Sequence, residues 1–268
     1  MSTPTERFEQ KFALVLDAAW ALADEVSTII DEEPLDAVRG DAFPQSTALR
    51  MLVGASPLYL AGVTCLRHAE STLGAFALCR PLVEYWSHAW HVMNAGANAE
   101  REAVRVQIGW ARADRDGLLG SPLAAPGELD KARRDVAYLE SIMTERRWKV
   151  SSRDRSHVTA TLKEMQRALS FDWVVGMYEG SSRVLHANGH QWRMVDSGGG
   201  TSALTDAPPS ERAARLNHLV ILWHSFSSSA LVLMGMPGDS PRQLAYRETV
   251  NAIIGSSWLA RVLDGDYD

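Results

Sequence analysis

The chain has 268 residues, of which 46% are hydrophobic, and its formal net charge is −6 at pH 7. A chain of this length can bury one large core or two small ones. A net negative surface repels nucleic acid and anionic lipid unless the charge is locally reversed, so we expect neither a membrane nor a nucleic acid as partner.

Cysteine usage and the apolar runs favour a cytoplasmic protein. Cys65 and Cys79 lie in apolar helical sequence and match no metal-binding spacing. Two buried thiols fit a reducing compartment. The first residues, MSTPTERFEQK, lack the basic-then-apolar pattern of a signal peptide. The longest uncharged run, 219–236, contains His224 and four serines, which is more typical of a buried core helix than of a membrane span.

Helical spacing dominates the chain from its first residues. Apolar side chains recur every three or four residues over 5–32, which predicts an amphipathic helix. We expect Pro57 to restart a helix as a first-turn residue. The only weak strand candidate is 191–195, in the least regular part of the chain. After 5–32, helices are expected over 46–56, 57–70, 71–95, 99–119, 128–148, 158–169, 172–187, 210–236 and 241–263.

The pattern of elements predicts an all-α protein. We expect a single helical bundle of seven to nine helices, with an irregular Gly-rich loop near 190–207. One domain is expected over 1–268, in which the N-terminal helix 5–32 packs on a core bundle formed by 46–264.

The apolar helix 71–95 carries one polar face. At ~100° per residue, Arg80, Glu84, His88 and His91 fall within an arc of about 80°. Exposed helix faces usually use Lys, Glu, Asp and Gln, whereas the arginine, glutamate and histidines of this face can pair and titrate. The face is therefore interpreted as the lining of an internal pocket, with a solvent face or a structural ion pair as the alternative.

Pro81 lies inside this helix and affects the position of Arg80. Proline removes one backbone hydrogen bond and disfavours helical geometry at the preceding residue. Either the helix kinks at Pro81 or a new helix begins there.

Two later helices also carry polar faces. Tyr178, Ser182 and His186 follow one another at steps of four residues and share a face. A local alternative is that Ser182 bonds back to the Tyr178 carbonyl and that His186 interacts with the helix end. We expect the polar faces to converge on one pocket between helices. The third face consists of His218, Ser225 and Ser229, for which hydroxyls bonded to their own backbone are the favoured interpretation.

The motifs exclude several kinds of chemistry. No Glu-x-x-His, H-E-x-x-H, G-x-S-x-G or phosphate-binding loop occurs in the chain. Glu84, His88 and His91 cannot hold one ion from a single helix, because seven residues rise ~10 Å while zinc ligands lie ~2 Å from the metal. We therefore expect no metal and no cofactor.

A resemblance to a known family is carried by two of these helices. Arg80 and Glu84 in Arg-x-x-x-Glu, with Tyr178, Ser182 and His186 in Tyr-x-x-x-Ser-x-x-x-His-x-Asn-Gly, resemble an uncharacterised family of all-helical bacterial proteins. The resemblance covers roughly residues 45 to 235. It implies a bacterial protein that folds as a helical bundle, without implying a known activity.

A more distant similarity is to the higher eukaryote and prokaryote nucleotide-binding (HEPN) domains. These helical bundles are often dimeric and include RNases marked by Arg-x4–6-His, and Arg183 to His190 fits that spacing. This similarity implies nucleic-acid binding or RNase activity as an alternative function, and it leaves a homodimer open.

The residues favour a small-molecule enzyme that uses metal-independent acid–base catalysis. His88 or His91 would act as the general base or acid, because imidazole titrates near neutrality. Glu84 would orient the imidazole, and Arg80 would bind an anionic group of the ligand.

The remaining candidate residues would bind the substrate or shape the pocket. Tyr178, Ser182 and His186 would form hydrogen bonds with it, and Trp86 or Trp90 would form the apolar wall. Isomerisation, cyclisation or elimination needs no more than this set. The alternatives are a HEPN-like nucleic-acid protein and a non-catalytic helical scaffold or ligand sensor.

Overall fold

The computed structural model describes residues 3–32, 43–119, 121–125, 127–149, 158–170, 173–185 and 207–266, and within them all regular structure is helical. The short 3-10 turns Ala69–Ser71 and Gly96–Asn98 precede α3 and α4. The α-helices of these described residues are α1 (Pro4–Glu32), α2 (Phe43–Cys65), α3 (Thr72–Asn94), α4 (Ala99–Leu119), α5 (Glu128–Glu145), α6 (Val158–Leu169), α7 (Trp173–Leu185), α8 (Pro209–Leu233), α9 (Pro241–Ile254) and α10 (Ser257–Leu263).

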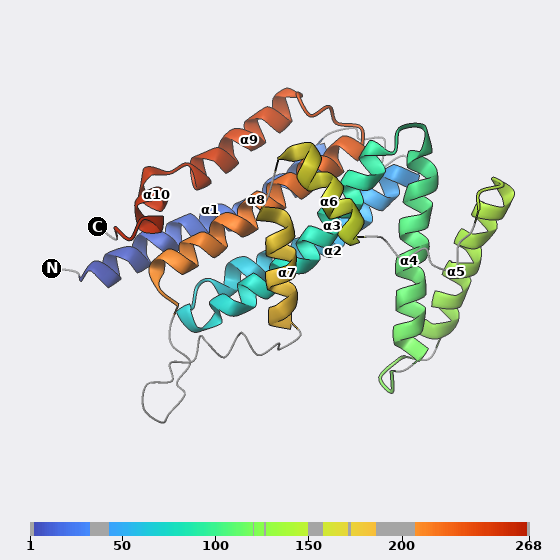
Figure 1. Cartoon of the computed structure of the whole chain (residues 1–268), viewed down its shortest axis with the longest axis horizontal. Helices are drawn as coiled ribbons and strands as arrows, with labels where there is room; N and C mark the ends of the chain where they lie inside the picture. The colour runs from blue at the N-terminus through green and yellow to red at the C-terminus, as the bar shows by residue number, and fades with distance from the viewer. Residues whose placement is uncertain are drawn as a thin grey trace.

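Helix α3 is at the centre of the bundle. It packs most extensively on α8 and α2, and it also contacts α4, α6 and α7. Figure 1 shows α1, α2, α3 and α8 side by side as a long layer, with α7 crossing in front of α3. The paired helices α4 and α5 project from one end of this layer.

The main core is formed by the apolar faces of the long helices. The face of α1 repeats Phe8, Phe12 and Leu16 at steps of four residues, and all three are buried. Tyr59 of α2 stacks on Trp223 of α8, with ring centroids 4.8 Å apart. A second, smaller apolar cluster holds α5 on α4 and consists of Val104, Ile108, Leu139 and Met143.

The expected all-α class is confirmed, but the expected number of seven to nine helices is too low, since the described residues form ten α-helices. The predicted helix 241–263 is in fact two, because the chain leaves the helix at Gly255 and Ser256 caps α10 by accepting a hydrogen bond from the Leu259 amide. The strand candidate 191–195 lies outside the described residues, as does nearly all of the loop near 190–207.

Two prolines lie inside helices. The expected restart at Pro57 is wrong, because α2 runs continuously from Phe43 to Cys65. The carbonyl that loses its partner belongs to Val53, whose residue is 67% exposed, so water can satisfy it. Likewise α3 continues through Pro81, which decides between the two alternatives and keeps Arg80 in phase with Glu84.

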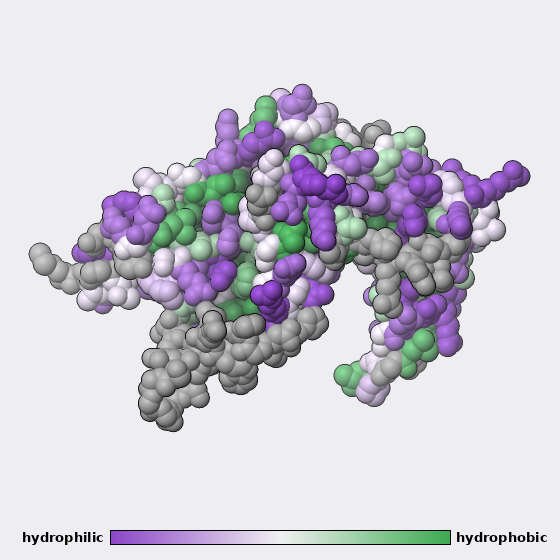
Figure 2. Space-filling view, viewed as in Figure 1, coloured by the Kyte–Doolittle hydropathy of each residue, from purple (hydrophilic) through white to green (hydrophobic). Residues whose placement is uncertain are grey.

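The surface and the apolar helices leave the location of the protein open. Hydrophilic side chains cover much of the face in Figure 2, and apolar ones gather at the free end of the α4–α5 pair, where Leu119 and Leu123 are exposed. By length and composition, α2 and α8 are each apolar enough to cross a membrane, a property that buried core helices share. A cytoplasmic location therefore stays a prediction.

A buried arginine joins three parts of the bundle. The side chain of Arg212 at the start of α8 is almost fully buried and donates from Nη2 to the Leu66 carbonyl over 2.8 Å. It also forms an ion pair with Glu9 of α1. Its guanidinium carbon lies 4.8 Å from the ring centroid of Phe12. Arg212 therefore ties α8 to α1 and to the end of α2.

We predict that Arg212→Met lowers the free energy of unfolding by about 3 kcal/mol, because it leaves a buried carbonyl without its donor. Urea denaturation measures this loss. The control is Arg242→Met, whose 2.6 Å ion pair with Glu32 is largely exposed and should cost less than about 1 kcal/mol. Equal losses in the two variants would contradict a structural role for Arg212.

Candidate functional site

A polar cluster lies where α7 crosses α3. Arg80 Nε donates to Glu84 Oε1 over 3.0 Å, one turn further along α3. Tyr178 of α7 donates its hydroxyl to the same oxygen over 3.3 Å. The guanidinium carbon of Arg80 lies 5.4 Å from the centroid of the Tyr178 ring. We call Arg80, Glu84 and Tyr178 the α3–α7 polar cluster.

The cluster is partly buried, which strengthens its electrostatics. The Arg80 and Glu84 side chains are 25% and 35% exposed. Burial alone would lower the pKa of the Arg80 guanidinium, but its hydrogen bond with Glu84 and the nearby Tyr178 and Glu84 oxygens raise that pKa overall. Burial, followed by the Glu84 charge, raises the pKa of Tyr178. Near neutral pH the Arg80 guanidinium is therefore charged and the Tyr178 phenol is neutral.

Both donors within the cluster use one oxygen of Glu84. Arg80 and Tyr178 bond to Oε1, and Oε2 accepts no hydrogen bond from the part of the chain that the structure describes. The Glu84 side chain as a whole is 35% exposed. The cluster therefore offers a free acceptor beside a guanidinium.

His88 follows Glu84 by one turn but has different surroundings. Its residue is only 7% exposed, and its ring meets the Trp110 ring edge-on with centroids 5.8 Å apart. Burial, with a smaller contribution from His91, lowers the pKa of His88 to about 4. His88 forms no hydrogen bond or ion pair with any described residue. Its orientation by Glu84 stays a prediction that no described contact supports.

His91, the last member of the predicted face, turns toward α4. Its Nε2 lies 3.2 Å from Glu102 Oε2. Arg101 and Arg105 bind the same carboxylate, at 2.8 and 3.2 Å. Burial raises the pKa of Glu102, but the bonds from His91 and Arg101 and the charge of Arg105 outweigh it, so the pKa is lowered overall. The predicted polar face thus divides between α7 and α4.

Helix α8 brings its own polar residues to α7 and α3. The imidazole of His218 stacks on Trp173 of α7, with centroids 6.1 Å apart. The Arg215 guanidinium carbon lies 3.9 Å from the ring centroid of Phe76 on α3. His218 Nδ1 is buried and has no hydrogen-bond partner among the described residues, and burial, together with Arg215, lowers the pKa of His218 to about 4. Polar residues of α3 and α8 therefore each contact α7, Glu84 through Tyr178 and His218 through Trp173.

The other predicted site residues form hydrogen bonds within their own helix, pack in the core or lie outside the described residues. Ser182 donates to the Tyr178 carbonyl over 2.6 Å, as in the local alternative. Ser229 likewise donates to the Ser225 carbonyl. Trp86 is buried in the core and Trp90 packs against it. Among the residues that the structure leaves undescribed are His186, Asn188, Gly189 and His190.

Several residues of the region escaped the sequence analysis. Glu102 lies one turn before Val106 on the buried face of α4, so helical spacing marks it as a buried acid. Trp173 and Arg215 carry no comparable signal, because only the fold places them beside His218 and Phe76.

The described residues contain no group of three or more His, Cys, Asp or Glu side chains that could hold a metal ion. No protein-family model, curated protein or solved structure matches the chain. Function must therefore be argued from the geometry of the site.

The buried imidazole of His88 makes stability depend on pH. The unfolded chain binds a proton at this histidine below about pH 6.5, but the folded protein binds it only near pH 4. The stability that the folded protein has while His88 is neutral is therefore fully present above pH 6.5 and is lost as the pH falls toward 4. Between pH 7 and pH 5 the wild-type protein should lose about 2 kcal/mol more unfolding free energy than His88→Leu.

Urea denaturation at pH 8, 7 and 5 measures the pH dependence of His88→Leu against wild type. The comparison uses the change with pH and not the absolute stability, so the packing cost of the substitution cancels. Parallel pH profiles for the two proteins would show that His88 is protonated equally in both states.

Proposed function

We propose that the α3–α7 polar cluster is the site of a small-molecule enzyme with metal-independent acid–base chemistry, in which Glu84 moves the proton. The observation that carries this proposal is the difference between the two oxygens of the Glu84 carboxylate. Two donors hold Oε1, and Oε2 remains free to accept a proton from a substrate. A base held in one orientation is what general base catalysis requires.

The neighbours of Glu84 favour an anionic substrate. The Arg80 guanidinium is a donor with fixed geometry that suits a carboxylate. Tyr178 can donate its hydroxyl to a developing negative charge once it leaves Glu84. Trp173 of α7 stacks on His218 and Phe76 of α3 packs against Arg215, so the two helices that form the cluster also carry aromatic rings.

The proposed step balances without a cofactor. A substrate proton passes to Glu84 Oε2, which becomes a neutral carboxylic acid while the electron pair stays on the substrate. The acid then returns the proton to another atom in an isomerisation or a cyclisation, or to the leaving group in an elimination.

Of the predicted catalytic residues, the geometry favours Glu84 as the base, although the sequence predicted one of the two histidines as the base and Glu84 as the residue that orients it. His88 is buried against Trp110 and has a pKa of about 4, so it is neutral and enclosed at pH 7. His91 is engaged with Glu102 of α4. Glu84 alone combines partial exposure with a free oxygen.

A non-catalytic scaffold or ligand sensor is the second candidate, and one observation favours it. Arg80, Glu84 and Tyr178 bond to one another, and Ser182 bonds to the Tyr178 carbonyl, so the cluster also links α7 to α3 without any ligand. In that case the cluster would only hold α7 in position on α3.

The test begins with a thermal-shift screen of small carboxylic acids against the full chain. Compounds that bind are then followed by proton NMR in deuterated water, which records both conversion and exchange of substrate hydrogen for deuterium. Glu84→Gln should reduce the rate at least 100-fold while the affinity changes little, because the amide keeps the shape but accepts no proton. Arg80→Gln should weaken binding about tenfold.

The matched control is Glu164→Gln, which changes an exposed acid on α6 and should leave rate and affinity at wild-type values. A full rate in Glu84→Gln would end the proposal. Stability separates the second candidate: a scaffold predicts that Glu84→Leu unfolds more easily, whereas a site maintained for function predicts a gain in stability.

A further inference from the structure

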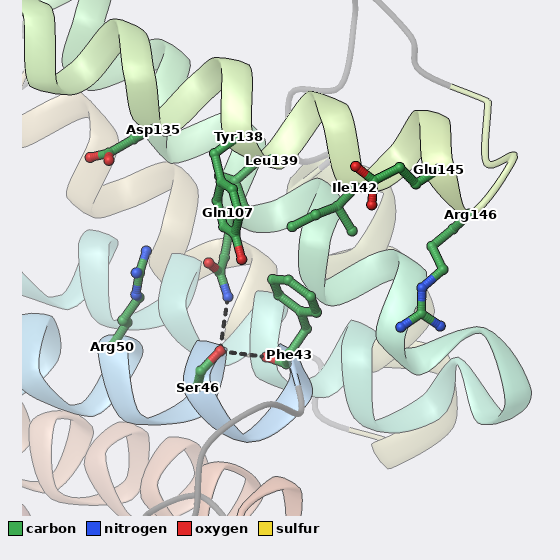
Figure 3. A pocket seen from close by; sticks show the side chains of 10 residues that line it. All are labelled: Phe43, Ser46, Arg50, Gln107, Asp135, Tyr138, Leu139, Ile142, Glu145 and Arg146. Atoms are coloured by element: carbon green, nitrogen blue, oxygen red, sulfur yellow. Dashed lines mark hydrogen bonds between the residues drawn. The ribbon is translucent and has the colours of Figure 1, made fainter.

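A cleft of about 440 Å³ lies between α2, α4 and α5, apart from the α3–α7 polar cluster and sharing none of its residues. Figure 3 shows the side chains that line it. Phe43, Leu139 and Ile142 lie in its middle, and charged side chains lie at its two ends. The cleft therefore combines an apolar centre with ionic ends.

One buried amide in the cleft is held in a fixed orientation. Gln107 is only 3% exposed, and its Nε2 donates to Ser46 Oγ over 3.2 Å and to Thr47 Oγ1 over 2.6 Å. These two bonds use both hydrogens of the amide nitrogen. The Oε1 atom is thereby directed away from Ser46 and remains an acceptor for a donor inside the cleft (Figure 3).

Two charges of the cleft are compensated within the protein. Arg146 pairs with Glu100 over 3.3 Å, and Asp135 pairs with Lys131 over 2.9 Å. Neither of these pairs needs a ligand to balance its charge.

Two other charges of the cleft are uncompensated. Arg50 and Glu145 form no ion pair with any residue that the structure describes. Figure 3 shows them at opposite ends of the cleft, with the apolar side chains between them. One end therefore offers a free cation and the other a free anion.

The length of the cleft follows from α5. Asp135 lies at the Arg50 end, and it precedes Glu145 by about ten residues, which at ~1.5 Å per residue span roughly 15 Å. Extended peptide advances about 3.5 Å per residue, so about four residues fill this span.

We propose that the cleft binds a zwitterionic molecule with an apolar body, of the class of short apolar peptides with free termini. The α-carboxylate pairs with Arg50 and the α-ammonium with Glu145. Backbone amides of the peptide donate to Gln107 Oε1, and its side chains pack on Phe43 and Ile142.

Isothermal titration calorimetry of the full chain with the peptide Ala-Leu-Leu-Ala tests this assignment. The free peptide should bind, and either N-terminal acetylation or C-terminal amidation should weaken binding about tenfold. The variants assign each end: in Arg50→Gln amidation should have no further effect, and in Glu145→Gln acetylation should have none.

Two matched controls change exposed charges outside the cleft. Arg134→Gln on α5 and Glu248→Gln on α9 should bind the free and the blocked peptides as the wild-type protein does. Absence of binding at millimolar peptide, equal binding of free and blocked peptides, or retention of both blocking effects in Arg50→Gln and Glu145→Gln would each overturn the proposal. The Glu84 variants leave this binding unchanged, so the two proposals fail independently.

Discussion

The burial of α3 on nearly every side is the constraint from which the rest of the arrangement follows. Helices α2, α4, α6, α7 and α8 all contact it. A helix in this position must be apolar around most of its circumference, and any polar side chain on it needs a partner from a neighbouring helix. Glu84 finds Tyr178 on α7, and His91 finds Glu102 on α4. His88 has no such partner in the part of the chain that the structure describes, and burial keeps it neutral at pH 7.

Helix α4 connects α3 to the helices that line the cleft. Glu102 binds His91 of α3, and Gln107 lies about one and a half turns further along and binds α2 through Ser46 and Thr47. Helix α4 also supports α5, through Val104 and Ile108. The position of α5, and with it one wall of the cleft, therefore depends on polar contacts that fix α4 against α2 and α3.

The spacing of apolar residues predicted well on which side of its helix a residue lies, but it did not predict which residues of other helices it contacts. The apolar spacing located most helices to within a few residues, and it placed Arg80, Glu84 and His91 on the partly buried side of α3. It misplaced the ends around Pro57 and Gly255, because tertiary packing decides whether a helix continues through such residues. Spacing within one helix contains no information on what faces it. The contacts of Tyr178 with Glu84, and the buried Arg212 at the start of α8, arise only from the arrangement of helices in space.

Energetics favour a functional interpretation of the α3–α7 polar cluster over a purely structural one. An i, i+4 ion pair that is a quarter to a third exposed, as that of Arg80 and Glu84 is, contributes only about 0.5 kcal/mol. A leucine buried in the same contact between helices would contribute about 2 kcal/mol. Arg212 shows the opposite balance, since it is fully enclosed and its loss would leave a buried carbonyl unpaired. Stability therefore accounts for the arginine of α8, whereas it gives little reason for a central helix to carry an arginine and a glutamate beneath a tyrosine of α7. The ligand that we propose for the free oxygen of Glu84 would supply that reason.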